Sequence, residues 1–163
     1  MKRLLSLLFI TVFFCTALSA AVILHSPNGK ICVEINLGPQ LTYNVKADGQ
    51  VLMNNNELAL KLANGSVLGE NPQLSNTKFS KINQIIRPLF PLKKAEVADN
   101  CNVVTLNFKA NYSIQFRAYD DGVAYRFITR MKGLMTINDE TCNLHLDPNY
   151  LVHLQLNSSF HTS

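Results

Sequence analysis

Two neighbouring runs of alternating apolar and polar side chains, at 112–118 and 123–128, stand out in the second half of the chain. Every second side chain in each run is apolar, which is the period of a strand with one buried face. Between the runs lie Asp120, Asp121 and Gly122. This is a turn signal, because Asp bonds to nearby backbone and Gly adopts positive φ without strain. The pattern therefore predicts a β-hairpin.

Similar alternating runs occupy the first half of the chain and predict a meander of antiparallel strands. Asn28-Gly29 and Asp48-Gly49 are turn signals between successive runs. The asparagines at 54–56 interrupt the alternation before it resumes. The expected strands are 31–37, 41–46, 51–53, 57–62, 102–109, 112–118 and 123–128, with an extended segment at 22–25 and one or two further strands between 135 and 146.

The stretch from 68 to 100 has the weakest pattern in the chain. Gly69, Pro72, Pro88 and Pro91 interrupt short apolar pieces there, so we expect edge strands and long connections. No segment of the mature chain keeps the helical period of 3.6 over three turns. We therefore predict a single all-β domain, most simply an antiparallel sandwich.

The first 21 residues form a separate segment. Met1, Lys2 and Arg3 give it a basic start, residues 4–18 are almost entirely apolar, and small residues at 17–21 offer a cleavage site. These are the three parts of a secretory signal peptide, with cleavage after position 19 or 21. A membrane anchor is the alternative, but about 15 apolar residues fall short of the roughly 20 that span a bilayer. We therefore expect a secreted or periplasmic protein with no membrane segment after cleavage.

Composition and charge exclude several classes of function. The chain of 163 residues is 47% apolar and 16% charged, which is typical of a globular protein rather than a disordered one. Two of its 15 Lys and Arg residues lie in the signal segment, which leaves 13 against 11 Asp and Glu. No cluster of Lys and Arg is interleaved with aromatic residues, so nucleic-acid binding is not expected.

The sequence offers no recognisable catalytic or metal-binding set. After the signal segment, Cys32, Cys101 and Cys142 are an odd number, so at most one disulfide can form among them. No CxxC or Cys/His spacing indicates zinc, and GxSxG, P-loop, HExxH and Rossmann motifs are absent. Asp139 and Glu140 are adjacent, but neighbouring strand residues point to opposite faces, which is poor geometry for paired catalytic carboxylates. We expect no catalytic residue and no metal ligand.

Each strand of the expected hairpin carries an arginine, Arg117 in the first and Arg126 in the second. An arginine in an apolar strand must reach solvent along its stem or find a carboxylate. Asp120 and Asp121, in the turn between them, are the nearest candidates. Two interpretations remain open: an ion-paired hairpin that fixes its own geometry, or a group of residues that contacts a ligand.

Three stretches resemble one family of enzymes. They are Ser-Pro-Asn-Gly-Lys at 26–30, Leu-Thr-Tyr-Asn-Val at 41–45 leading to Asp48-Gly49, and Phe-Arg-Ala-Tyr-Asp-Asp-Gly-Val-Ala-Tyr-Arg-Phe at 116–127. In this order the chain resembles the N-terminal domain of glycoside hydrolase family 97. The resemblance implies an antiparallel β-super-sandwich of the galactose-mutarotase-like type. It also implies a relation to secreted bacterial α-glucosidases and α-galactosidases, which are the enzymes of this family. In those enzymes this domain packs against a catalytic (β/α)8 barrel, and calcium lies at the active site.

The chain departs from the family pattern at one strand and in length. Ala59 stands where the family usually has a glycine, a change compatible with the same strand. The resemblance ends near Leu146, and a (β/α)8 barrel needs at least about 200 further residues. Behind the signal peptide at 1–21 we therefore expect an incomplete super-sandwich at 22–147, a divergent tail at 148–163 and no catalytic barrel. The family's calcium ligands match no position here, so no cofactor is expected in this chain.

The expected function is a carbohydrate-binding domain that is not catalytic alone. The resemblance implies an oligosaccharide or α-glycoside as the ligand and a catalytic barrel, if present elsewhere, as a partner. It directs attention to the polar ends of the hairpins, where the candidate ligand-binding residues are Arg117, Tyr119, Asp120, Asp121 and Arg126. The chain has no Trp, the strongest platform for stacking on a sugar, which argues against a strong autonomous lectin.

Two alternative functions remain open at this point. The chain can be the non-catalytic part of an α-glucosidase or α-galactosidase whose barrel is supplied by a separate chain. It can also be an envelope interaction domain that keeps the sandwich for binding a partner.

Overall fold

Every regular element in the described part of the chain is a β-strand. The computed structural model describes residues 20–90 and 94–152. The strands are β1 (Ala20–His25), β2 (Ile31–Leu37), β3 (Leu41–Ala47), β4 (Gln50–Leu62), β5 (Val67–Leu68), β6 (Leu74–Ile86), β7 (Val97–Phe108), β8 (Tyr112–Ala118), β9 (Val123–Thr129) and β10 (Ile137–Cys142). Within these residues there is no helix with the length and apolar character needed to cross a membrane. All but two residues of the expected signal peptide, and most of the expected tail, lie outside the described ranges.

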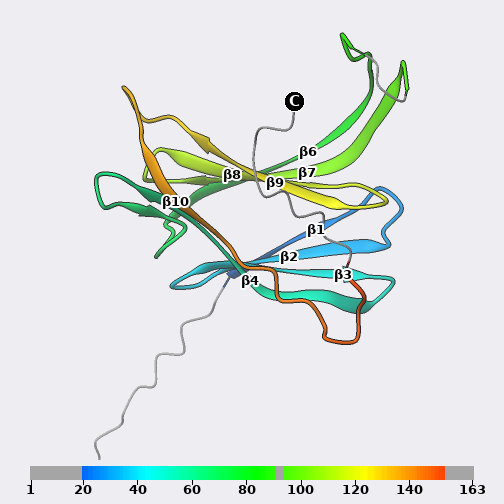
Figure 1. Ribbon diagram of the computed structural model, residues 1–163, viewed down its shortest axis with the longest axis horizontal. Helices are drawn as coiled ribbons and strands as arrows, with labels where there is room; N and C mark the ends of the chain where they lie inside the picture. The colour runs from blue at the N-terminus through cyan, green and yellow to red at the C-terminus, as the bar shows by residue number, and fades with distance from the viewer. Residues whose placement is uncertain (1–19, 91–93, 153–163) are drawn as a thin grey trace, which may run out of the picture.

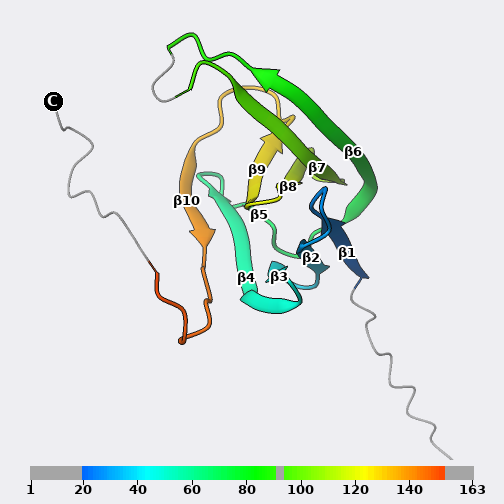
Figure 2. The same cartoon turned by 90° about the vertical axis from the view of Figure 1, so that its right-hand side faces the viewer.

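The strands form two antiparallel sheets that face each other (Figure 1). The larger sheet has the order β1-β2-β3-β4-β10, with β5 paired to β4, and the smaller sheet has the order β6-β7-β8-β9. In Figure 2, β10 lies on one side of the sandwich, and β1 and β6 lie on the other. The prediction of an all-β antiparallel sandwich is confirmed.

The β8–β9 hairpin forms as the alternation predicts. Ala118 pairs with Val123, and the turn is closed by a hydrogen bond from Tyr119 N–H to Gly122 O (2.8 Å). The apolar side chains of β8 point inward, and Phe116 is fully buried. The remaining side chains of β8 therefore lie on the outer face of the smaller sheet.

The core lies between the inner faces of the two sheets. Its fully buried side chains include Val33, Ile35, Leu41 and Leu58 from the larger sheet and Val104, Leu106, Ile114 and Phe116 from the smaller one. The rings of Tyr43 and Phe116 meet across the core with their centroids 5.6 Å apart in a tilted geometry, which suits aromatic pairs. The strands with clear alternation thus supply the apolar contacts that hold the sheets together.

Hydrogen bonds also join the two sheets beside the β8–β9 turn. Asn28 N–H, in the turn between β1 and β2, donates to Asp120 Oδ1 (2.9 Å). Asn102 Nδ2, on β7, donates to His25 O (2.9 Å) at the end of β1. The turn of the hairpin is therefore tied to the first turn of the larger sheet.

Gly69, in the loop after β5, provides another link between the sheets. Its N–H donates to the hydroxyl of the buried Tyr112 (3.2 Å) on β8. Gly69 has a φ of +100°, and a Cβ at this position would overlap the carbonyl oxygen of Leu58. Only glycine fits both the backbone conformation and the space.

One long strand, β4, replaces the two short strands expected on either side of the asparagines. Its register shifts against β3, and Asn55 has a φ of +52°. Asn56 is fully buried; its side chain donates to Tyr43 O (3.2 Å) and accepts from His145 N–H (2.6 Å). The asparagines bend the strand without ending it, because Asn tolerates left-handed backbone and its amide satisfies the groups left unpaired at an irregular ladder.

The prediction that the stretch from 68 to 100 contains only short edge strands is wrong, because the strands there are long. β6 and β7 form a ladder that runs from the pair Leu74 and Phe108 to the pair Ile86 and Val97. β6 is an edge strand, as expected, but most of its side chains are exposed on both faces. A strand without a buried face has no alternating pattern, so the sequence carried little signal for its extent.

β1 begins with small residues of the expected cleavage site. Ala20 pairs with Leu37, and Ala21 pairs with Asn36. Cleavage after position 19 would leave β1 complete, whereas cleavage after position 21 would remove these two ladder pairs. The cleavage itself stays a prediction.

Candidate functional site

The outer face of the smaller sheet carries the polar side chains of the hairpin. Gln115, Arg117 and Tyr119 alternate with the buried residues of β8 and therefore lie on this face. Arg126 of β9 lies on the same face, opposite Gln115, whereas Arg117 is opposite Ala124. The two arginines thus share a face but occupy different positions along the ladder.

The ion-pair partner of Arg117 is Asp99 of β7. Asp99 Oδ2 accepts a hydrogen bond from Gln84 Nε2 (2.9 Å) and lies 3.6 Å from Arg117 Nη1. Asp99 Oδ1 accepts from the Tyr119 hydroxyl (3.0 Å). The expectation that an aspartate of the adjacent turn pairs with this arginine is wrong, because the pairing of β7 with β8 brings a more distant carboxylate closer.

These contacts stabilise the charged form of Asp99. The hydrogen bond from Gln84, followed by that from Tyr119 and by the charge of Arg117, lowers the pKa of the Asp99 carboxyl below its ordinary value of 3.8. The hydrogen bond with the Tyr119 hydroxyl is the main cause that raises the pKa of the Arg117 guanidinium. We call Gln84, Asp99, Arg117 and Tyr119 the Asp99 clamp. Its polar groups are engaged with one another.

The two aspartates of the turn serve different parts of the molecule. Asp120 Oδ1 accepts the hydrogen bond from Asn28 N–H. Asp121 lies beside Val123 at a cavity between the sheets. Neither aspartate forms an ion pair with an arginine in the ranges that the structure describes.

The five candidate residues therefore do not converge on one site. Two belong to the Asp99 clamp, and one holds the turn between β1 and β2. Arg126 is exposed and has no ion-pair partner among the described residues. Sequence reasoning missed Asp99 and Gln84, because both lie in the stretch whose strands have little alternation. Their role depends on pairing between strands that are distant in the sequence.

A row of polar side chains crosses the outer face at Gln115. It consists of Lys78, Thr105, Gln115 and Arg126, which are successive ladder partners on β6, β7, β8 and β9. Gln115 Nε2 donates to Thr105 Oγ1 (3.1 Å), whereas the buried Gln115 Oε1 has no hydrogen-bond partner among the described residues. We call these four residues the Gln115 row. Its unsatisfied acceptor is buried, and the side chains at the two ends of the row, Lys78 and Arg126, are exposed cations.

The neighbouring row on the same face is satisfied. Asn107 Nδ2 donates to Asn76 Oδ1 (2.6 Å). Asn107 Oδ1 accepts from Ser113 Oγ (2.7 Å) and from Arg130 Nη1 and Nη2 (both 3.2 Å). In contrast to Asn107, Gln115 therefore keeps an acceptor atom without a hydrogen-bond partner among the described residues.

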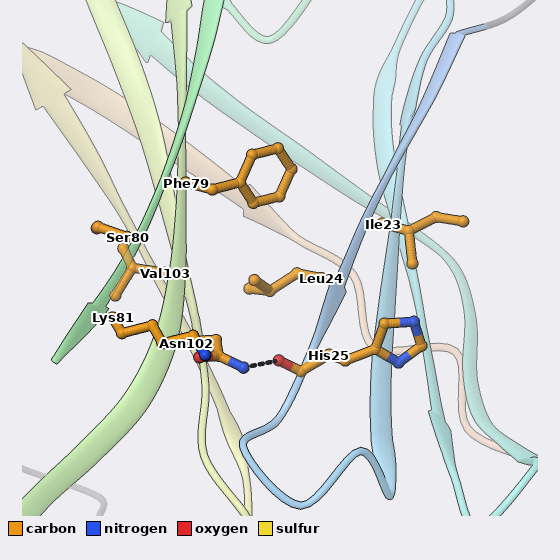
Figure 3. Close-up of a pocket in the computed structure, with 8 residues that line it drawn as sticks. All are labelled: Ile23, Leu24, His25, Phe79, Ser80, Lys81, Asn102 and Val103. Atoms are coloured by element: carbon orange, nitrogen blue, oxygen red, sulfur yellow. Dashed lines mark hydrogen bonds between the residues drawn. The ribbon is translucent and has the colours of Figure 1, made fainter. Parts of the chain in front are cut away.

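A hollow of about 370 Å³ opens between the edge strands β1 and β6. Figure 3 shows Leu24 and Phe79 pointing toward one another across it, while the side chains of Ile23 and His25 lie on the far side of β1. The Asn102 amide at this hollow is engaged with His25 O. The hollow is therefore mainly an apolar gap between two strand edges.

The described residues offer no donor set for a metal ion. No group of three or more His, Cys, Asp or Glu side chains in these ranges is arranged to hold one. No such group of side chains is therefore available, in the described part of the chain, to the calcium that the family resemblance implies. Within the described ranges the cysteines are free thiols: Cys101 is buried, Cys32 is half-buried and Cys142 is exposed.

Comparison with known protein families decides where the chain belongs. The family model described as Glycosyl-hydrolase 97 N-terminal matches residues 24–163. This protein belongs to the glycosyl-hydrolase 97 N-terminal family. The match confirms the resemblance inferred from the sequence, and it includes the tail at 148–163.

Several enzymes are similar to this chain in sequence or in fold. A retaining α-galactosidase of Bacteroides thetaiotaomicron is 36% identical over 109 residues, which are 67% of this chain and 16% of that enzyme. A family 97 enzyme of Pseudoalteromonas sp. strain K8, in complex with panose, matches 78% of this chain with a TM-score of 0.67 and 21% identity. The crystal structure of a β-arabinopyranosidase matches 77% of this chain with a TM-score of 0.69 and 18% identity. At these low identities, the two structures show that the fold is shared.

This family 97 domain spans a small part of the enzymes that it resembles. It covers 16% of the α-galactosidase and 20% of the Pseudoalteromonas enzyme. The family assigned to the matched part is the N-terminal domain, so the sequence in hand lacks the catalytic domain. The prediction that these residues do not form a catalyst alone is thereby confirmed.

Proposed function

We propose that this family 97 N-terminal domain is secreted and binds α-linked oligosaccharides through the Gln115 row. Family membership supports a carbohydrate ligand, and the Pseudoalteromonas enzyme has been solved in complex with panose and with acarbose. The basic start and apolar run of the first 21 residues support secretion. The observation that carries the proposal is the buried, unpaired Oε1 of Gln115 beside the exposed Arg126.

The chemistry of the Gln115 row suits a sugar hydroxyl. A hydroxyl donates one hydrogen bond and accepts others, so it can accept from the exposed Arg126 and, when the half-buried Gln115 side chain turns outward, donate to Gln115 Oε1. A buried acceptor without a partner costs about 1–3 kcal/mol, and a bound hydroxyl would remove part of that cost. Four strands spaced about 4.8 Å apart make the row about 14 Å long, which is enough for a short oligosaccharide.

We expect the affinity of this face to be low. The Gln115 row contains no aromatic side chain on which a sugar ring can stack, and the hydroxyl of the nearby Tyr119 is engaged in the Asp99 clamp. The row would therefore add contacts to a substrate that a catalytic domain holds elsewhere. Oligosaccharide binding by this domain is a contribution to recognition, and catalysis requires another domain.

An NMR titration of the chain with panose and with acarbose tests the proposal. The side-chain amide resonances of Gln115 should shift on binding. Arg126→Ala should weaken binding about tenfold, because one charge-assisted hydrogen bond, worth about 1.4 kcal/mol, is lost. The matched control is Lys61→Ala, which removes an exposed cation from β4 of the other sheet and should leave the affinity unchanged. No binding of either sugar, or an equal loss in both variants, would refute the proposal.

A second class of function, protein interaction, is favoured by the exposed apolar side chains near the far end of β6 and β7. Under this alternative, the chain assists an α-glucosidase or α-galactosidase whose barrel is a separate chain, or it is an envelope interaction domain. Sequencing the DNA beside the gene distinguishes these two roles. An intact neighbouring gene for a family 97 barrel supports the first, whereas its absence, together with failed sugar binding, favours the second.

A further inference from the structure

The ribbon of β6 and β7 extends past the rest of its sheet. The last residue of β8, Ala118, pairs with Asn102, so the ribbon beyond this point has no partner in β8. Figures 1 and 2 show this part of the ribbon projecting from the sandwich. Its large apolar side chains are exposed: Ile85 (57%), Ile86 (44%), Leu89 (88%), Phe90 (80%) and Val97 (42%). We call these five side chains the apolar arm.

The Asp99 clamp holds the base of the apolar arm. Gln84 and Asp99 belong to the ribbon just beyond the end of β8, whereas Arg117 and Tyr119 come from the end of β8 itself. Their contacts join the ribbon to the sandwich where the ribbon leaves it. A structure held in place before binding loses less conformational entropy when it docks. The arm is therefore built to present apolar surface.

An apolar cavity of about 690 Å³ lies on the open side of the sandwich, between the larger sheet, β9 and the segment after β10. Its lining includes Tyr43, Met53, Tyr125, Leu146 and Leu151. The β9 side chains that face the core are only half-buried, whereas those of β8 are buried. Residues 20–90 and 94–152 therefore cover the core incompletely on this side.

The charges beside the arm and the cavity are opposite in sign. Beside the arm, Arg87 and Glu96 pair with each other (2.7 Å from Arg87 Nη2 to Glu96 Oε1), which leaves the charge of the exposed Lys94, a residue without an ion pair within the described ranges. At the cavity, Asp121 forms part of the lining, and Glu140 Oε1 accepts a hydrogen bond from the hydroxyl of Tyr125 (3.3 Å). The two surfaces are thus complementary both in apolar character and in charge.

We infer that the apolar arm of one copy of this chain docks into the cavity of a second copy. The arm offers projecting side chains, and the cavity offers apolar walls with carboxylates nearby. Both surfaces belong to the same chain, so they are present at equal concentration. Pairing through the β6 edge is disfavoured, because Lys78 and Lys81 lie on that strand. The contact closes into a dimer if it is reciprocal and forms larger assemblies if it is not.

Sedimentation velocity of the mature chain, which begins at Ala20 and so keeps β1 complete, tests this inference over a wide range of concentrations. We expect the chain to associate as its concentration rises. In the double variant Leu89→Ser, Phe90→Ser, the association constant should fall at least about tenfold. The matched control is Leu134→Ser, which changes another fully exposed leucine, outside the arm and the cavity. All three side chains are exposed, so the β-sheet circular dichroism should be retained. A chain that is monomeric at every concentration, or a control that loses as much association, would overturn the inference.

Cross-linking tests where the contact lies. Cys142 lines the cavity and is exposed, whereas Cys101 is buried and Cys32 is half-buried. In the variant Lys94→Cys, a short bismaleimide should join the arm of one copy to Cys142 of another and give a dimer on a denaturing gel. Adding Cys142→Ser should abolish that dimer. A dimer that persists, or no cross-link in a chain that associates, places the contact elsewhere and contradicts the inference. No residue of the Gln115 row is changed, so these results are independent of sugar binding.

Discussion

The β8–β9 hairpin and the β6–β7 ribbon are neighbouring antiparallel pairs in one sheet, yet they are stabilised differently. β8 has one face in the core, where its apolar side chains are buried. Most side chains of β6 are exposed on both faces, and this strand is held mainly by its ladder with β7. The difference teaches that alternation along this chain reports burial of one face. It does not report whether a segment is a strand.

The same comparison changes where partners are expected to bind. Several polar groups of the hairpin, which the sequence marks as candidates, are engaged within the protein. The ribbon, which the sequence describes poorly, leaves large apolar side chains exposed. Exposed apolar groups that are close together often mark an interaction surface. The unsatisfied Gln115 row is the exception on the outer face of the hairpin.

The largest expected effect is the difference in stability between two variants, one that truncates a buried phenylalanine and one that truncates an exposed phenylalanine. Phe116→Ala should lower the free energy of unfolding by about 3–5 kcal/mol, because it leaves a cavity between the sheets. Phe79→Ala, on β6, should cost less than about 1 kcal/mol, because its side chain is 58% exposed. Urea unfolding followed by circular dichroism measures both values. Equal losses would show that the ribbon is as much part of the core as the hairpin.

The next effect concerns the Asp99 clamp, where the ribbon meets the hairpin. Asp99→Asn removes the charge that Arg117 pairs with, so amides of the arm should exchange with deuterium several-fold faster relative to those of β8. The matched control is Glu96→Gln, which removes an exposed ion pair with Arg87 on the ribbon and should change exchange little. Unchanged protection in Asp99→Asn would mean that the ladder alone holds the arm.

The clamp should also depend on pH. The folded pKa of Asp99 is lowered, so its stabilising contribution is complete above the ordinary value of 3.8 and is lost as the pH falls through the folded pKa. Deuterium exchange of the arm should therefore speed up, relative to β8, as the pH is lowered below about 3.8. After correction for intrinsic exchange rates, this relative step should be missing in Asp99→Asn. A step that persists in the variant would assign it to another carboxyl group.

The smallest effect compares two tyrosine hydroxyls at the inner face of the hairpin. Tyr112→Phe removes the buried acceptor of Gly69 N–H and should lower the free energy of unfolding by about 1 kcal/mol. Tyr125→Phe removes an exposed hydrogen bond to Glu140 and should cost less than about 0.5 kcal/mol. Chemical denaturation of both variants distinguishes the two. The reverse order would show that the open side near β9 is better packed than its half-buried side chains indicate.

Much of the fold was predictable from local patterns. The strands that face the core, the Asp-Asp-Gly turn and the sandwich class follow from alternation and turn chemistry. The bend in β4 was visible as three asparagines, but its continuity depended on pairing with β3 and β10. Of the candidate site, the sequence indicated the polar face through Arg117 and Arg126. It did not indicate Gln115, because an unsatisfied acceptor is defined by what surrounds it.

The sequence by itself determined the family, the turns and most of the strands with one buried face, because these depend on residues that are close together in the chain. Only the tertiary structure decided that Arg117 pairs with Asp99, that β6 and β7 project as an arm, and that a cavity opens beside β9. Each of these features depends on which distant strands become neighbours and on which faces stay uncovered. That information lies in the packing of the two sheets, and no local pattern contains it.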